Sequence, residues 1–290
     1  MAELLQFLFS GVTVGAIYAA VALGFTIIYN ASGVVNFAQG EFVVIGGMTT
    51  AALIAAGVPV FIAAPVAVLV GTLVGVLLYK VAIEPARQAP LVSLIIITIG
   101  ASIFLRGAVQ FVFDKQIHRY PGFSGDEALQ VLGATLLPQS LWIVGGSVLV
   151  FLVLAWFFGG TRAGRGVRAT ASNRLAAKLV GVNTSRAMNL SFALSAAVGA
   201  LAGVIATPVT FTSYDAGVLI ALKGFSATML GGVGSPLGAL VGGFAIGLIE
   251  ALTAGYISSD YKDAAAFIVI LAVLFFMPQG LFGRRITERV

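Results

Sequence analysis

The sequence predicts an all-α integral membrane protein, a bundle of eight to nine transmembrane helices in which interrupted helices line a central pathway. Of its 290 residues, 59% are hydrophobic and only 9% are charged, whereas a soluble domain has about 25% charged residues. No charge occurs from Leu4 to Gly40 or from Phe42 to Tyr79, and roughly 20 apolar residues span a bilayer. Polar and glycine-rich segments interrupt these apolar runs, as in helices that line a cavity.

The polar interruptions divide the chain into candidate spans. The first span ends at Asn30-Ala31-Ser32-Gly33, and Gly57-Val58-Pro59 splits the second uncharged run in two. The count is eight or nine because 218–256 can form two spans or two re-entrant half-helices. We expect one transmembrane domain over 1–290, with spans near 5–29, 42–56, 60–79, 91–113, 141–158, 187–206, 218–232, 236–256 and 264–280.

The basic residues predict the orientation. The segment 159–186 carries six Lys or Arg residues and no acidic residue, so the positive-inside rule places it in the cytoplasm. Alternating spans then place 114–140 outside, the N-terminus outside and the C-terminus, with Arg284, Arg285 and Arg289, in the cytoplasm. The formal net charge of +5 is thus a topology signal, and we expect no binding to nucleic acid.

The sequence lacks the residues that several classes of enzyme require. There is no cysteine and one histidine, His118, which makes a zinc or haem site improbable. No G-x-x-x-x-G-K-[ST] phosphate loop occurs, and no set of nucleophile, base and acid stands out. We therefore expect a protein that is not an enzyme and has no catalytic residue, metal or cofactor.

Two polar interruptions are the candidate pathway. Asn36-Phe37-Ala38-Gln39-Gly40-Glu41 carries side chains that are costly in lipid, so it should face a wet cavity or a partner helix. The alternative is a cytoplasmic turn with Glu41 in the first turn of a helix, where the helix dipole favours an anion. The segment 231–238 should break a helix, since its glycines free the backbone and its proline removes a donor. The candidate pathway residues are Asn36, Gln39, Glu41, Lys223, Gly234 and Ser235.

Isolated features inside the spans have simpler explanations. Lys223 lies one or two turns into its span, so we expect its side chain to snorkel outward. Arg106 lies deeper, and we expect it to pair with an acidic neighbour rather than contact substrate. Lys223, Arg106 and Glu250 look too scattered to form a proton relay. The pattern Gly199-x-x-x-Gly203 predicts a close contact between helices.

The segment 159–186 contains a predicted surface helix. Residues 169–180 can form a helix that ends at Gly181 in the left-handed conformation. Leu175 and Leu179, at positions i and i+4, give this helix an apolar stripe. The stripe fits an interfacial helix on anionic lipid headgroups and equally a helix that docks in a groove of a cytoplasmic protein.

The same segment resembles a known coupling loop. Leu175-Ala176-Ala177-x-x-x-Gly181 is similar to the Glu-Ala-Ala-x-x-x-Gly signature of ABC importer permeases, although it lacks the glutamate. Its surroundings look more specifically like the branched-chain amino acid permease family of LivH type. By this resemblance the residues that couple to ATPases are Arg168, Asn173, Arg174, Ala176, Ala177 and Gly181. Further similar segments are Val35-Asn36-Phe37-Ala38-Gln39-Gly40-Glu41-Phe42, Leu222-Lys223-Gly224-Phe225, Gly231 to Ala239 and Met277 to Gly283.

This resemblance implies an ABC importer in the inner membrane. The chain would pair with a second homologous permease subunit, two cytoplasmic ATP-binding subunits and a periplasmic substrate-binding protein. ATP binding in those partners would drive alternating access for branched-chain or other apolar amino acids. The alternatives are urea or short amides as substrates, or an ion-coupled secondary carrier. A purely structural scaffold fits poorly because of the polar helix breaks.

Overall fold

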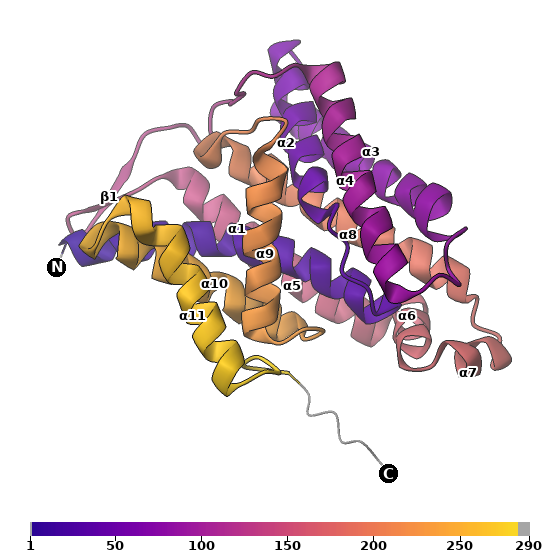
Figure 1. The fold of residues 1–290 in the computed structure, drawn as a ribbon. Coiled ribbons are helices and arrows are strands. Elements are labelled where there is room, and N and C mark those ends of the chain that lie inside the picture. Colours follow the sequence, from indigo (N-terminus) through magenta and orange to yellow (C-terminus); the bar gives the residue numbers. More distant parts are fainter. Residues whose placement is uncertain (1, 284–290) are drawn as a thin grey trace.

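The computed structural model describes residues 2–283, and almost all of their regular structure is helical (Figure 1). Arg284, Arg285 and Arg289 lie outside these residues. The elements are α1 (Ala2–Ser32), α2 (Gln39–Ala55), α3 (Val60–Leu78), the π-helix η1 (Tyr79–Ile83), α4 (Leu91–Phe113), β1 (Leu129–Val131), β2 (Ala134–Leu136), α5 (Pro138–Gly160), α6 (Arg162–Ser172), α7 (Arg174–Leu179), α8 (Thr184–Thr210), α9 (Ala216–Gly231), α10 (Pro236–Tyr256), the 3-10 helix η2 (Ser259–Tyr261) and α11 (Lys262–Phe276).

The helical membrane bundle is confirmed. Within residues 2–283, six helices are long and apolar enough to cross a membrane: α1, α3 with η1, α4, α5, α8 and α10. Helices α2 and α9 are apolar but shorter, and α11 has 15 residues. The expected breaks at 57–59 and 231–238 are present. The count of eight to nine spans stays a prediction.

Helix α1 is the axis of the bundle. Its most apolar 18-residue window is 89% buried, whereas those of α4 and α5 are each 17% buried. Figure 1 shows α1 running through the middle of the molecule, where it packs against α10, α8, α9 and α5. A Cβ built on Gly15 would lie 2.8 Å from the Cα of Phe244. The absence of side chains at such positions lets the backbones approach closely, which drives association in lipid.

The predicted contact at Gly199-x-x-x-Gly203 is confirmed. A Cβ on Gly199 would lie 2.9 Å from the Cβ of Phe42, and one on Gly203 would overlap the carbonyl oxygen of Val43. These glycines therefore bring α8 against α2. This places the first residues of α2, including Gln39, against the middle of α8.

The single helix predicted over 169–180 is wrong. Helix α6 ends at Ser172, and α7 begins at Arg174. Asn173 between them is extended, with φ −157° and ψ 106°, and its side chain accepts a hydrogen bond from the N–H of Ala176 at 2.9 Å. Asparagine favours such caps over helix interiors because its side chain competes for backbone N–H groups.

The exterior segment predicted over 114–140 contains a small hairpin. Strands β1 and β2 pair antiparallel, with Val131 opposite Ala134. His118 forms an isolated antiparallel bridge with Thr212, and the hydroxyl of Tyr120 donates to the carbonyl of Val204. These contacts hold the segment against the end of α8.

We predict that Gly203→Ala destabilises the purified chain by about 1–3 kcal/mol, because the added methyl overlaps the backbone of α2. Its thermal unfolding midpoint in detergent should fall. The matched control is Gly145→Ala in α5, whose Cβ would meet nothing within 4 Å. An unfolding midpoint for Gly203→Ala that equals that of the control would contradict the close contact.

Candidate functional site

Gln39 cross-links three helices at the break between α1 and α2. Ser195 of α8 donates its hydroxyl to Gln39 Oε1 at 2.6 Å, and Gln39 Nε2 donates to the carbonyl of Ser195 at 3.2 Å. The same hydroxyl lies 2.8 Å from the carbonyl oxygen of Gly24 in α1. Gln39 is fully buried, so it faces partner helices and fixes the start of α2.

Asn36 lies at the same break, beside a small cavity. It is fully buried; its Oδ1 accepts from the N–H of Ala38 at 3.2 Å, and its Nδ2 has no partner among the described residues. The cavity of about 90 Å³ is also lined by Arg87 and by Arg174 of α7. The predicted pathway segment and the predicted coupling segment therefore share a cavity.

Glu41 connects α2 to α4. It lies in the first turn of α2 and is 1% exposed. Ser102 donates to Glu41 Oε1 at 2.8 Å, and Arg106 Nη2 lies 3.4 Å from the same oxygen. Glu41 therefore lies in the first turn of a helix and also meets a partner helix, and the cytoplasmic location of this turn stays a prediction. The predicted acidic partner of Arg106 is confirmed.

A second cavity, of about 160 Å³, lies between α4, α9 and Phe37 of the connection between α1 and α2. Ser102 and Arg106 supply its polar wall, and the side chain of Arg106 is 32% exposed. Glu41 does not line this cavity, so it lies behind the other two residues. The remaining lining is apolar: Phe37, Ile99, Ile103, Val218, Ala221, Leu222 and Phe225.

The snorkelling predicted for Lys223 is wrong. Its Nζ lies 3.0 Å from Glu250 Oε1 and 2.7 Å from Asp263 Oδ1, and the side chain is 15% exposed. The hydroxyl of Tyr18 donates to Glu250 Oε2 at 2.8 Å, and Lys223 Nζ lies 5.3 Å from the centroid of the Tyr18 ring. Lys223 and Glu250 are therefore not scattered. The carboxylates of Glu250 and Asp263 take the place of the water molecules that would otherwise solvate the Lys223 ammonium. The cluster connects α1, α9, α10 and α11.

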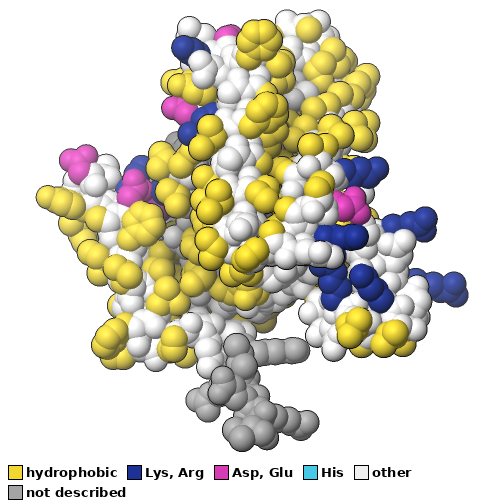
Figure 2. Space-filling view, turned by 45° about the vertical axis from the view of Figure 1, so that its right-hand side comes forward, with side chains coloured by type: hydrophobic (Ala, Val, Ile, Leu, Met, Phe, Trp, Pro, Cys, Tyr) yellow, Lys and Arg dark blue, Asp and Glu magenta, His cyan; other side chains and the backbone are white. Residues whose placement is uncertain are grey.

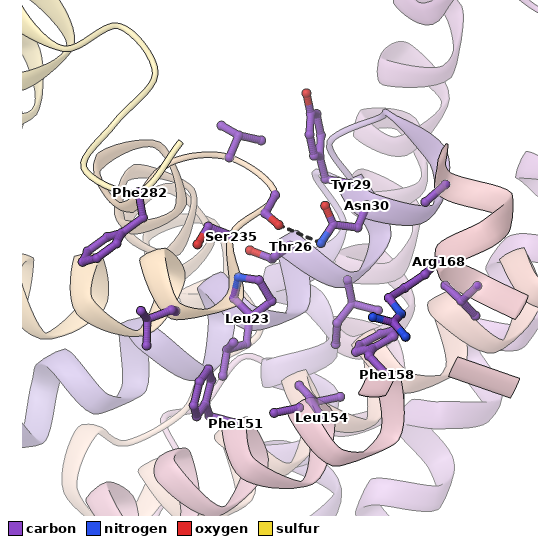
Figure 3. Close-up of a pocket in the computed structure, with 18 of the residues that line it drawn as sticks. Leu23, Thr26, Tyr29, Asn30, Phe151, Leu154, Phe158, Arg168, Ser235 and Phe282 are labelled. Carbon is purple, nitrogen blue, oxygen red and sulfur yellow. Dashed lines mark hydrogen bonds between the residues drawn. The ribbon is translucent and has the colours of Figure 1, made fainter. Parts of the chain in front are cut away.

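Gly234 and Ser235 lie at the break between α9 and α10, on a cavity of about 640 Å³. Asn30 Nδ2 donates to the carbonyl of Gly234 at 2.9 Å, as Figure 3 shows. The hydroxyl of Ser235 caps α10 by accepting from the N–H of Gly238 at 3.0 Å. Figure 3 also places Arg168 of α6 at this cavity. The structure thus places Arg168 on the same cavity as the break between α9 and α10.

Helix α7 presents an apolar surface. Leu175, Leu179 and Val180 are 71%, 81% and 78% exposed, whereas Ala177 is buried beneath them. The predicted stop is confirmed: Gly181 has φ +84°, and the N–H of Val182 donates to the carbonyl of Ala177 at 2.9 Å. Figure 2 shows Lys and Arg side chains gathered at the end of the molecule that α6 and α7 form.

Sequence reasoning missed several members of these sites. Ser102 lies four residues before Arg106 on α4 and so shares a face with it, a spacing that could have identified Ser102. Tyr18 and Asp263 join the Lys223 cluster from distant parts of the chain, and no local pattern indicates them. Within residues 2–283, no group of three His, Cys, Asp or Glu side chains could hold a metal ion.

Comparisons with known proteins match nearly the whole chain. The chain is 35% identical to the high-affinity branched-chain amino acid transport system permease protein LivH of Salmonella typhimurium, over 99% of this chain and 97% of that protein. It is 32% identical to BraD of Pseudomonas aeruginosa, described in the same words, over 99% and 98%.

A solved structure shares the fold. A chain of PsaBC from Streptococcus pneumoniae, in complex with Fab, superposes with a TM-score of 0.52 at 17% identity, covering 96% of this chain and 93% of that one. The model of the family "Branched-chain amino acid transport system / permease component" matches residues 7–274. The chain is therefore a multi-pass membrane protein that belongs to the family of permease components of branched-chain amino acid transport systems.

Proposed function

We propose that this chain is one membrane-spanning half of an ABC importer for branched-chain amino acids in the inner membrane. Its relatives LivH and BraD are named for that transport. The observation that carries the mechanism is the exposed apolar surface of α7, which nothing in residues 2–283 covers. ATP-binding subunits would dock there, so the chemical energy enters from partner chains.

The contacts of α6 and α7 provide a route for motion. Helix α6 begins directly after α5 at Thr161, whose side chain caps it, and packs against α5, α8 and α1. Displacement of α7 would therefore move α6 and Arg168 against the end of α1 and the break that contains Gly234. Arg174 would transmit the same motion to the cavity at Asn36. These contacts support alternating access through the two helix breaks.

The exposed face of α4 supports a second permease subunit as partner. Ten of the 23 residues of α4 are exposed, including Ile103 and Phe104 at 64% and 74%. Arg106 on this helix is partly exposed although it lies seven residues from the end of α4. A charge at that depth is costly against lipid, so we propose that this face meets the second subunit around the pathway.

Helix α5 supports the proposed orientation. It joins the 114–140 hairpin to α6, and its 23 residues span about 35 Å, enough to cross the hydrocarbon core. The hairpin and α7 thus lie on opposite sides of the membrane. We propose that the segment around the hairpin receives a periplasmic binding protein. There, the backbone N–H of Gln116 and the side chain of His118 hold the pKa of Asp114 below its ordinary value.

Leu179→Asp in α7 should weaken the association of the ATP-binding subunits about tenfold to a hundredfold, since a buried leucine contributes about 1.5–3 kcal/mol. Co-purification in detergent, without lipid, measures this effect. Arg162→Gln, an exposed residue of α6 outside the apolar surface, is the control. Normal co-purification of Leu179→Asp would instead favour a helix that lies on lipid headgroups.

Gly181→Val should also uncouple the ATP-binding subunits, because φ +84° at this position disfavours a β-branched residue. The end of α7 should rearrange while the bundle stays folded. ATP-driven uptake in proteoliposomes should fall, and the thermal unfolding midpoint of the chain should change little. Unchanged uptake would show that the geometry of the α7 terminus is not required.

The purified complex with its binding protein should take up leucine in proteoliposomes only when ATP is supplied on the side of the membrane that carries the ATP-binding subunits. Urea and short amides should neither be transported nor compete. Uptake driven by a proton or sodium gradient without ATP would overturn the ABC assignment. Uptake of urea in preference to leucine would overturn the substrate and leave the assignment of the transporter class intact.

A further inference from the structure

The cavity between α4, α9 and Phe37 has the chemistry of a carboxylate site. One wall carries the guanidinium of Arg106 and the hydroxyl of Ser102, and the other walls are aliphatic or aromatic. Its volume of about 160 Å³ suits a small molecule with one anionic end and one apolar end. Small-ligand sites have this composition, a few convergent polar groups within mostly apolar walls.

Arg106 retains hydrogen-bonding capacity for a ligand. A guanidinium has five N–H donors, and the contact of Arg106 with Glu41 is long, at 3.4 Å. Its Nε is buried and has no hydrogen-bond partner among residues 2–283, whereas about a third of the side chain as a whole is exposed. A planar guanidinium of this kind binds carboxylates with two parallel hydrogen bonds.

Glu41 keeps Arg106 in place without occupying the cavity. The carboxylate is buried behind Ser102 and Arg106, where it offsets the positive charge at membrane depth. Ser102 also donates to Glu41, which fixes the face of α4 relative to α2. Glu41 is therefore a positioning residue, whereas Arg106 is exposed to whatever enters the cavity.

We propose that Arg106, with the cavity between α4, α9 and Phe37, is a contact site for the carboxylate of an apolar amino acid during its passage through the membrane. The aliphatic side chain of the bound amino acid lies against Phe37, Leu222 and Phe225, which line the same cavity. This inference rests on the proposed function, because the pathway must pass the face of α4. The site selects against urea, which has no carboxylate.

The test compares three variants of the complete complex, with its binding protein, in proteoliposomes. Arg106→Gln should lower ATP-driven leucine uptake about tenfold or more, through loss of a charge-assisted contact. The double variant Arg106→Gln with Glu41→Gln removes both charges, so no uncompensated carboxylate stays buried. Arg106→Lys keeps the charge and should restore part of the uptake. Co-purification and the unfolding midpoint report assembly and folding.

The double variant separates ligand contact from a structural ion pair. If Arg106 contacts the substrate, the double variant assembles normally and still fails to transport leucine. If Arg106 only neutralises Glu41, the double variant regains normal uptake, and the inference is overturned. If the wild-type complex itself transports no amino acid, the proposed function fails instead.

A second measurement leaves both charges untouched. Leu222→Trp should narrow the cavity and lower leucine uptake about tenfold or more, because small changes in a packed pocket are strongly felt. The matched control is Leu219→Trp, one turn earlier on α9, where the side chain is 63% exposed and does not line the cavity. Equal uptake by the two variants would overturn the inference even if the charge variants failed to assemble.

Discussion

A bilayer core offers no water to a broken helix, and the rest of this structure depends on that constraint. Each interruption must find its hydrogen-bond partners inside the protein. The start of α2 is fixed by Gln39 and Ser195, and the break before α10 is fixed by Asn30 and by the cap at Ser235. These polar contacts are few, specific and buried or partly buried. They allow non-helical backbone at membrane depth without exposing it to lipid.

Glycine residues allow the helices of this bundle to pack closely. Close approach of α1 to α10 and of α2 to α8 requires positions without a Cβ, such as Gly15 and Gly203. The resulting short distances bring charged side chains of separate helices within reach of one another. Glu41 meets Arg106, and Lys223 meets Glu250 and Asp263. Charges that would be costly in lipid thereby become connections between helices.

The two ion pairs have different roles because of their exposure. The cluster at Lys223 joins four helices and lines none of the three cavities described. Arg106 is bonded to one carboxylate on its buried side and open to a cavity on the other. Helices α6 and α7 bring Arg168 and Arg174 to the cavities beside the two helix breaks. Motion of one surface helix can therefore reach both breaks.

The sequence by itself determined the membrane class, the helix breaks, the close glycine contact and the end of the surface helix at Gly181. These follow from local properties: hydropathy, glycine and proline content, and charge in short loops. It also predicted that Arg106 would have an acidic partner, because a charge at that depth needs one. The motif around Ala176 and Gly181 indicated the family that the full-length comparisons then showed.

Only the tertiary structure decided which distant residues meet. Lys223 binds carboxylates 27 and 40 residues further along the chain. Its position near the end of a span had predicted a side chain that snorkels to water, because the sequence does not show these distant partners. Asn173 caps α7 instead of continuing a helix, because α6 is held against α1 and α8 and the chain turns there. The cavity at Arg106 likewise forms where α4 and α9 converge on Phe37. Local patterns fix where helices begin and end, whereas packing geometry fixes which of their faces touch.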